Sequence, residues 1–222
     1  MLKTDKFDRI AVTTDVVIFS IIGGALKVLL VERGREPFKG QWALPGGFVR
    51  ADESVTQCAR RELAEETGVV DVYLEQLYSF GAVDRDPRER VITIAYFALV
   101  PLDKTSIRAA SDASDARWFA LAKVPDLAFD HRQILAQAHE RLIAKLGYST
   151  IALQMMPPEF TLSELQEVYE IIRGQPLDKR NFRKSILALG VLSDTGKKRG
   201  QGPYRPAQLY RAAELDTVTI IR

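Results

Sequence analysis

Cysteine and histidine are scarce in this sequence, and their scarcity excludes two kinds of site. Among 222 residues there is one cysteine, Cys58, and there are two histidines, His131 and His139. A single cysteine cannot form an internal disulfide, which excludes a disulfide scaffold and fits a reducing compartment. Two histidines are too few for a histidine metal site. We therefore interpret Cys58 as a packing residue and His131 as the start of a helix.

Long apolar runs are absent as well. No stretch approaches the roughly 20 apolar residues that span a bilayer, and residues 1–6 lack the apolar run of a signal peptide. We therefore expect a cytoplasmic protein with no membrane partner. The hydrophobic content of 46% is enough for a packed core, so disorder is excluded. The length allows one large or two modest domains.

The net charge of +2 is small, but the charges are unevenly placed. Residues 1–150 carry a net charge of −1, and residues 151–222 carry +3. Within the second part, residues 173–211 hold ten Lys or Arg against two Asp, a net charge of +8. A local imbalance of this size indicates a polyanion partner rather than solubility alone.

Residues 47–69 carry a dense pattern of glycine and acidic residues, G-x5-E-x7-R-E-[apolar]-x-E-E-x-G-[apolar]. Asp52 can cap a helix, and Gly68 supplies the left-handed residue that ends one. The segment between them is rich in helix formers, so we predict a helix over residues 53–67. The apolar residues Val55, Ala59 and Leu63 would form its buried stripe.

Three carboxylates crowd one row of the predicted helix, those of Glu62, Glu65 and Glu66. Like charges one turn apart destabilise a helix. A hard divalent cation such as Mg²⁺ or Mn²⁺ removes the repulsion, because it takes carboxylate oxygens as ligands. The carbonyl of Gly47 offers a further oxygen ligand. Arg61, with Glu53 as its partner, can hold the carboxylates in orientation.

The pattern from Gly47 to Val69 resembles the Nudix box of pyrophosphate-cleaving hydrolases. The resemblance implies catalytic or metal-binding roles for the box residues, which are Gly47, Glu53, Arg61, Glu62, Glu65 and Glu66. It also implies that the metal polarises a phosphoryl oxygen and activates a water to attack a diphosphate. Residues 79–91 are similar to what members carry after the box. A general base outside the box, and the residues around adenine and ribose, stay unassigned.

The apolar pattern places strands on both sides of this single helix. We predict strands at residues 10–19, 26–31, 91–100 and 116–119, and a helix over 130–146. This order suits the α/β/α sandwich with a mixed sheet that Nudix proteins share. The pattern breaks around residues 149–158, with residues 155–158 as the linker, so we place a domain boundary between residues 150 and 151.

The tail, residues 151–222, has the pattern of a winged helix-turn-helix domain. Thr161 and Glu164 form a capping box for a helix over 162–173, and Asp178 caps a second helix over 179–189. The strands at 191–194 and 207–211 are joined by a basic loop over 195–206 that suits a wing on phosphates. The second helix of such a motif enters the major groove of DNA. The predicted DNA contacts are Arg180, Asn181, Arg183, Lys184, Lys197, Lys198, Arg199 and Arg205.

A complete Nudix box followed by this tail resembles the Nudix-related transcriptional regulators of NAD metabolism. The most specific tail residues are 160–166, 181–184 and 192–196. The resemblance implies a homodimer that binds a palindromic operator on double-stranded DNA and represses genes of NAD synthesis or salvage. It also implies that the Nudix domain binds ADP-ribose or a related nucleotide, which releases the DNA.

Because all box carboxylates are present, three hypotheses stay open. The first is a regulator that senses ADP-ribose and hydrolyses it to AMP and ribose 5-phosphate. The second is a regulator with an idle Nudix site. The third is a plain Nudix hydrolase whose tail serves dimerisation, since winged helices also bind protein. The box handles the diphosphate alone, so a sugar-sensing regulator fits it too.

Overall fold

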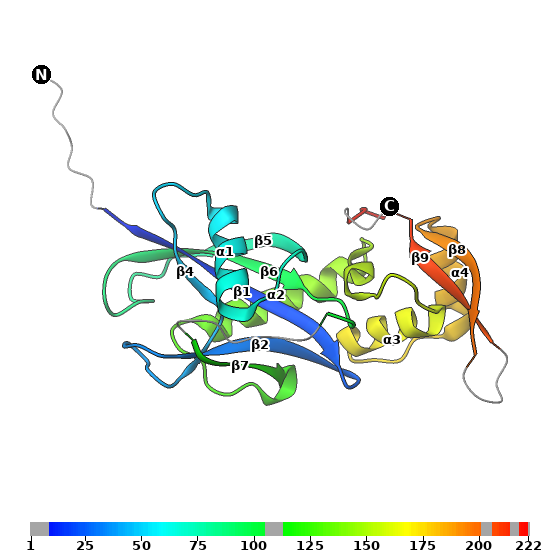
Figure 1. Ribbon diagram of the computed structural model, residues 1–222, viewed down its shortest axis with the longest axis horizontal. Helices are drawn as coiled ribbons and strands as arrows, with labels where there is room; N and C mark the ends of the chain where they lie inside the picture. The colour runs from blue at the N-terminus through cyan, green and yellow to red at the C-terminus, as the bar shows by residue number, and fades with distance from the viewer. Residues whose placement is uncertain (1–8, 105–112, 201–205, 214–217, 222) are drawn as a thin grey trace, which may run out of the picture.

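The first part of the chain forms a seven-stranded mixed sheet. The computed structural model describes residues 9–104, 113–200, 206–213 and 218–221 (Figure 1). The strands are β1 (Ala11–Ile22), β2 (Ala25–Arg33), β3 (Trp42–Ala43), β4 (Gly46–Phe48), β5 (Tyr73–Phe80), β6 (Val91–Leu99) and β7 (Ala113–Ala120). Strand β1 pairs parallel with β6, and the other pairings are antiparallel. No helix in these ranges is long and apolar enough to cross a membrane.

Alternate residues of β1 enter two separate cores, because successive side chains of a strand point to opposite faces. Val16 and Ile18 are buried on the face covered by helix α1 (Val55–Thr67). Val17 and Phe19 are buried on the face covered by helix α2 (His131–Leu146). The predicted α/β/α sandwich is confirmed (Figure 1).

The helix of the box begins later than predicted. Ser54, not Asp52, is its N-terminal cap, because the Ser54 side chain accepts from the Gln57 amide while the Gln57 side chain accepts from the Ser54 amide. This reciprocal pair satisfies two free amides at once. The predicted C-terminal end is confirmed, since Gly68 has φ 71°. Strand β5 has no counterpart among the predicted elements.

The tail has the predicted helix-turn-helix order. After a 3-10 helix η2 (Ile151–Met155) come α3 (Leu162–Arg173), α4 (Lys179–Ala188), β8 (Leu192–Arg199) and β9 (Ala207–Ala212). The capping box of Thr161 and Glu164 and the cap at Asp178 are confirmed. The predicted loop 195–206 is wrong in its first part, because β8 continues to Arg199 past a bulge at Gly196, with φ 73°. Arg205 lies outside the described residues.

The two parts of the chain share one core. Met155, in the segment predicted as a linker, is fully buried together with Leu142 of α2 and Leu165 of α3. Residues near the C-terminus return to the same junction, where the Ile221 amide donates to the Tyr148 carbonyl. The junction is therefore packed on several sides.

Candidate functional site

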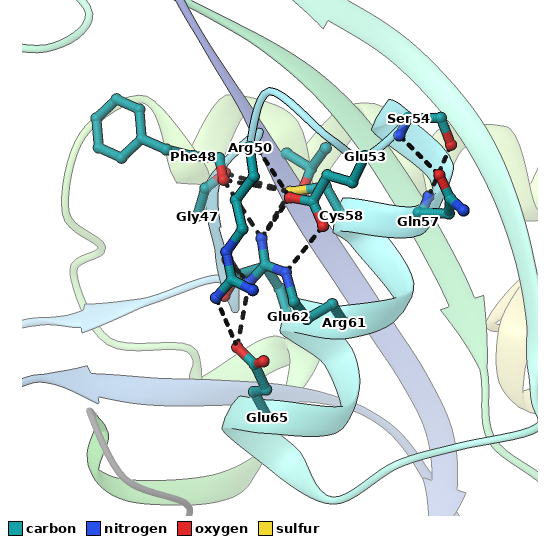
Figure 2. A network of polar contacts seen from close by, with 11 residues as sticks. Gly47, Phe48, Arg50, Glu53, Ser54, Gln57, Cys58, Arg61, Glu62 and Glu65 are labelled. Atoms are coloured by element: carbon teal, nitrogen blue, oxygen red, sulfur yellow. Dashed lines mark hydrogen bonds and ion pairs between the residues drawn. The ribbon is translucent and has the colours of Figure 1, made fainter.

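Arg61 holds three carboxylates of the box, those of Glu53, Glu62 and Glu65, in one network (Figure 2). Its Nε and Nη2 donate to the two oxygens of Glu53 at 2.9 and 2.6 Å, a bidentate pair. Its Nη1 donates to Glu62 at 2.6 Å and to Glu65 at 3.1 Å. These bonds from Arg61, with one from the Arg50 amide, lower the pKa of Glu53 to about 2. The predicted pairing of Arg61 with Glu53 is confirmed.

Glu62 and Glu66 lie against the glycines that precede the helix. A β-carbon on Gly47 would overlap the Glu62 carboxylate, so residue 47 must lack a side chain for this close approach. The Glu66 carboxylate accepts from the Gly46 amide at 2.9 Å. Burial raises the pKa of Glu62, and it raises the pKa of Glu66 to about 7. Both carboxyls therefore sit where an added positive charge would stabilise their ionised forms.

The donor set fits a hard divalent cation, with one rearrangement. Glu62, Glu66 and the Gly47 carbonyl offer the oxygen ligands that Mg²⁺ and Mn²⁺ prefer. Glu65 is half exposed and turns to Arg61 and Arg50 instead. Accordingly, no group of three or more acidic, His or Cys side chains within the described residues is assembled for a metal. Binding by all three predicted glutamates would require Glu65 to leave Arg61.

A hollow of about 140 Å³ adjoins the glycines and is lined by cations and aromatic rings that the sequence analysis missed. The Arg88 guanidinium lies 5.4 Å from the centre of the Phe48 ring, and that of Arg33 lies 4.7 Å from the centre of the Phe129 ring. Thr13 lines the same hollow, and its hydroxyl is buried without a hydrogen-bond partner among the described residues. The hollow thus offers positive charge beside the box.

A buried ionic cluster forms one wall of this hollow. Arg85 donates to Asp130 at 2.7 and 2.9 Å and to Asp15 at 3.2 Å, and its side chain is 4% exposed. His131 accepts from the Leu44 amide through Nδ1 at 2.9 Å, and its Nε2 lies 3.4 Å from Asp15. Burial opposes ionisation of Asp15, but the neighbouring His131 and Arg85 side chains lower its pKa below the ordinary value. His131 starts α2, as predicted, and it also contacts this cluster.

The predicted DNA contacts divide into two groups. On α4, Arg180, Asn181, Arg183 and Lys184 are all exposed. Arg183 donates to the Ser163 hydroxyl of α3 at 3.3 Å. On β8, Lys197 and Arg199 form ion pairs at 2.7 Å with Glu159 and Glu164 respectively, and Lys198 is exposed. The first group is therefore more available to phosphates than the second.

Comparison with known proteins finds two family matches, one in each part of the chain. Residues 12–138 match the NUDIX domain, and residues 152–212 match the NrtR DNA-binding winged helix domain. The chain is 43% identical over 208 residues to the ADPR responsive transcriptional repressor NtrR of Acinetobacter baylyi, which covers 92% of this chain and 82% of the relative. It is also 40% identical over 120 residues to the ADP-ribose pyrophosphatase of Methanocaldococcus jannaschii, covering 54% of this chain and 70% of the relative.

Solved structures of the Shewanella oneidensis NrtR are similar as well. Its complex with a 27mer DNA is 40% identical with a TM-score of 0.80, covering 90% of this chain and 93% of the other. Its NUDIX domain complexed with ADP ribose is 42% identical with a TM-score of 0.58, covering 64% of this chain and 94% of the other. The likeness to the first structure extends across both parts of the chain.

Proposed function

This chain belongs to the NrtR family of Nudix-domain transcriptional regulators with a C-terminal winged-helix DNA-binding domain, and we propose that it is a repressor that responds to ADP-ribose. We place the boundary between its two domains at residues 150 and 151. The observation that carries the proposal is the presence of a Nudix domain and a winged-helix domain in one chain. An acidic box beside a cationic hollow precedes a winged helix with exposed cations.

The Nudix domain supports a diphosphate ligand of the ADP-ribose type. Arg33 and Arg88 line the hollow next to Gly46, and Arg33, Arg88 and Glu66 also line a second hollow of about 180 Å³. Cations on one side and metal-binding carboxylates on the other are what a diphosphate needs. The similar proteins from Acinetobacter baylyi and Methanocaldococcus jannaschii are an ADPR responsive transcriptional repressor and an ADP-ribose pyrophosphatase, respectively.

The winged helix supports binding to double-stranded DNA. α4 follows α3 after a short turn and exposes Arg180, Arg183 and Lys184, the arrangement in which a second helix lies in the major groove. A homodimer would place two such helices on a palindromic operator with half-sites one or more turns apart. The regulated genes we propose are those of NAD synthesis or salvage, with ADP-ribose binding releasing the DNA.

Hydrolysis of ADP-ribose to AMP and ribose 5-phosphate is a second activity that we propose for the box. Glu62, Glu66 and the Gly47 carbonyl would hold Mg²⁺ or Mn²⁺, while Arg61 keeps Glu62 in place through the Glu53 pair. The bound cation would polarise the diphosphate and lower the pKa of the attacking water. Arg33 and Arg88 would hold the phosphates, and the domain is related to ADP-ribose pyrophosphatases.

Two assays on the full chain test this function. A gel shift with the DNA upstream of its own gene should show a specific complex, which ADP-ribose dissociates in metal-free buffer. Absence of specific DNA binding would overturn the repressor proposal. Incubation with ADP-ribose and Mn²⁺ should release AMP, and Glu66→Gln should abolish the release. No turnover by the wild type would overturn the hydrolase proposal and leave the repressor proposal standing.

A further inference from the structure

Helix α2 links the ligand hollow to the DNA-binding domain. Its first residue, His131, lines the hollow, and its last residue, Leu146, lies in the core shared with α3. Sixteen residues make a rod of roughly 24 Å. Figure 1 shows the helix running along one face of the sheet towards α3. His139 and Ile143, on its second half, face residues 170–174 at the C-terminal end of α3 across a groove. Helix α2 therefore contacts both the hollow and α3.

The start of α2 is held by an unusual contact. Asp130 occupies the N-terminal cap position, but its side chain makes no capping hydrogen bond. Both of its oxygens accept from Arg85 instead, while Arg85 also contacts Asp15 of β1. The Asp15–Arg85–Asp130 cluster, which we call the clasp, therefore ties α2 to the sheet through one buried guanidinium.

Arg85 also lines the hollow in which the ligand's phosphates would lie, so the same guanidinium faces two kinds of anion. Resting on the function proposed above, we propose that the diphosphate of ADP-ribose competes with Asp130 for Arg85, and that loosening the clasp moves α2 and with it α3 and α4. A closed clasp corresponds to the DNA-binding state. A ligand can shift such an equilibrium only through a contact that differs between the two states, and Arg85 supplies that contact.

The Asp130 carboxylate has an alternative partner once it leaves Arg85. Aspartate is among the best N-terminal caps, since its oxygen accepts from the amides of the first turn. Asp130 freed from Arg85 can therefore bond the first turn of α2, which changes the position of that turn relative to the sheet. The clasp and the cap are alternative partners for one side chain, so the start of α2 has two discrete arrangements.

The variant that tests the clasp is Asp130→Asn, with Asp126→Asn as its matched control. Asp126 precedes α2 in the same segment, its side chain is fully exposed, and it lies 3.5 Å from Arg132. For the full chain we would measure the Kd for operator DNA with and without saturating ADP-ribose, and the Kd for ADP-ribose by calorimetry in metal-free buffer. Wild type and Asp126→Asn should show a DNA Kd ratio of about 5 to 150.

Asp130→Asn, in which the clasp is weakened, should bind DNA more weakly without ligand and bind ADP-ribose more tightly. Since the ligand then has no clasp left to loosen, the ratio of DNA Kd with and without ADP-ribose should lie within about twofold of one. A merely destabilising substitution would not tighten ligand binding. Retention of the wild-type ratio in Asp130→Asn, or weaker ligand binding, overturns the clasp alone. A ratio of one in the wild type overturns the clasp together with the proposed response to ADP-ribose.

A measurement on the wild type covers the case in which the variant fails to fold. Amide hydrogen exchange with and without ADP-ribose should change in the first turn of α2 and in α3. Changes confined to the box helix and residues 44–48 would overturn the proposal.

Discussion

The cations of the Nudix site and those of helix α4 are placed in opposite ways. Arg61 makes short hydrogen bonds to Glu53, Glu62 and Glu65, and its side chain is 16% exposed. On α4, Arg180 and Lys184 are exposed, and no ion pair of theirs occurs among the residues that the structure describes. The first arrangement fixes geometry before a ligand arrives, whereas the second leaves charge available for a polyanion.

The difference has a thermodynamic consequence. Buried, paired charges are screened little by salt, while exposed cations that neutralise phosphates release counterions. Ligand binding at the box should therefore respond weakly to ionic strength, and DNA binding should respond steeply. Gly47→Ala perturbs the first arrangement, and replacement of Arg180 and Lys184 perturbs the second.

The largest effect is expected for Gly47→Ala. The new methyl would overlap the Glu62 carboxylate and displace it from its place beside the glycines. A displacement of about 1 Å can cost roughly 100-fold in rate, so AMP release should fall by about that factor or more. DNA binding without ligand should stay at the wild-type level. Unchanged turnover, measured by AMP release with Mn²⁺, would contradict the role of Gly47.

The next effect concerns α4. Replacing both Arg180 and Lys184 by alanine should weaken operator binding and lower the slope of log K against log salt by about 2, one for each phosphate contact. Lys123→Ala, an exposed cation on the short helix Leu121–Lys123, should leave the slope unchanged. Titrations at several salt concentrations measure both. An unchanged slope in the double variant would place the DNA on another surface.

A smaller effect should appear in the pH dependence of stability. Because burial raises the pKa of Glu66 from 4.5 to about 7, the folded metal-free protein holds a proton that the unfolded chain has lost. Its stabilisation is complete below about pH 4.5 and is lost as the pH rises through 7. The free energy of unfolding should fall across this window in urea titrations with a chelator. Glu66→Gln should flatten the fall, whereas the exposed Glu65→Gln should not.

The smallest effect distinguishes the observed cap from the predicted one. Ser54→Ala removes a cap of α1 and should lower the free energy of unfolding by about 1 kcal/mol. Asp52→Ala, at the position predicted from the sequence, should change it by much less, since Asp52 is exposed and precedes the cap. Thermal or urea unfolding of the two variants makes the comparison. Equal losses would contradict the assignment of Ser54.

Elements whose boundaries are set by residues adjacent in sequence were predicted better than elements that depend on distant pairing. Helix α3 was predicted to the residue, because its capping box and Gly174 are neighbours of the helix in sequence. Strand β5 was missed because it is an edge strand in which Leu77 alone is buried, so its apolar alternation is weak. The extension of β8 was missed because its sequence is polar and includes Gly196.

The same distinction applies to the site. The carboxylates and Arg61 lie on one helix, and their spacing was sufficient to predict the row and the pairing with Glu53. The cationic hollow is assembled from β2, the segment after β5 and the residues before α2, so its members are far apart in sequence. Arg33, Arg85 and Arg88 come together only through the sheet topology, which no single pattern encodes.

The central claim is that occupancy of the Nudix site controls DNA binding by the winged helix. The most direct measurement is a titration of the full chain with fluorescent operator DNA, in metal-free buffer, with and without ADP-ribose at a concentration that calorimetry shows to be saturating. We predict that ADP-ribose raises the DNA Kd by about 5- to 150-fold. An unchanged Kd with the ligand site filled would contradict the account.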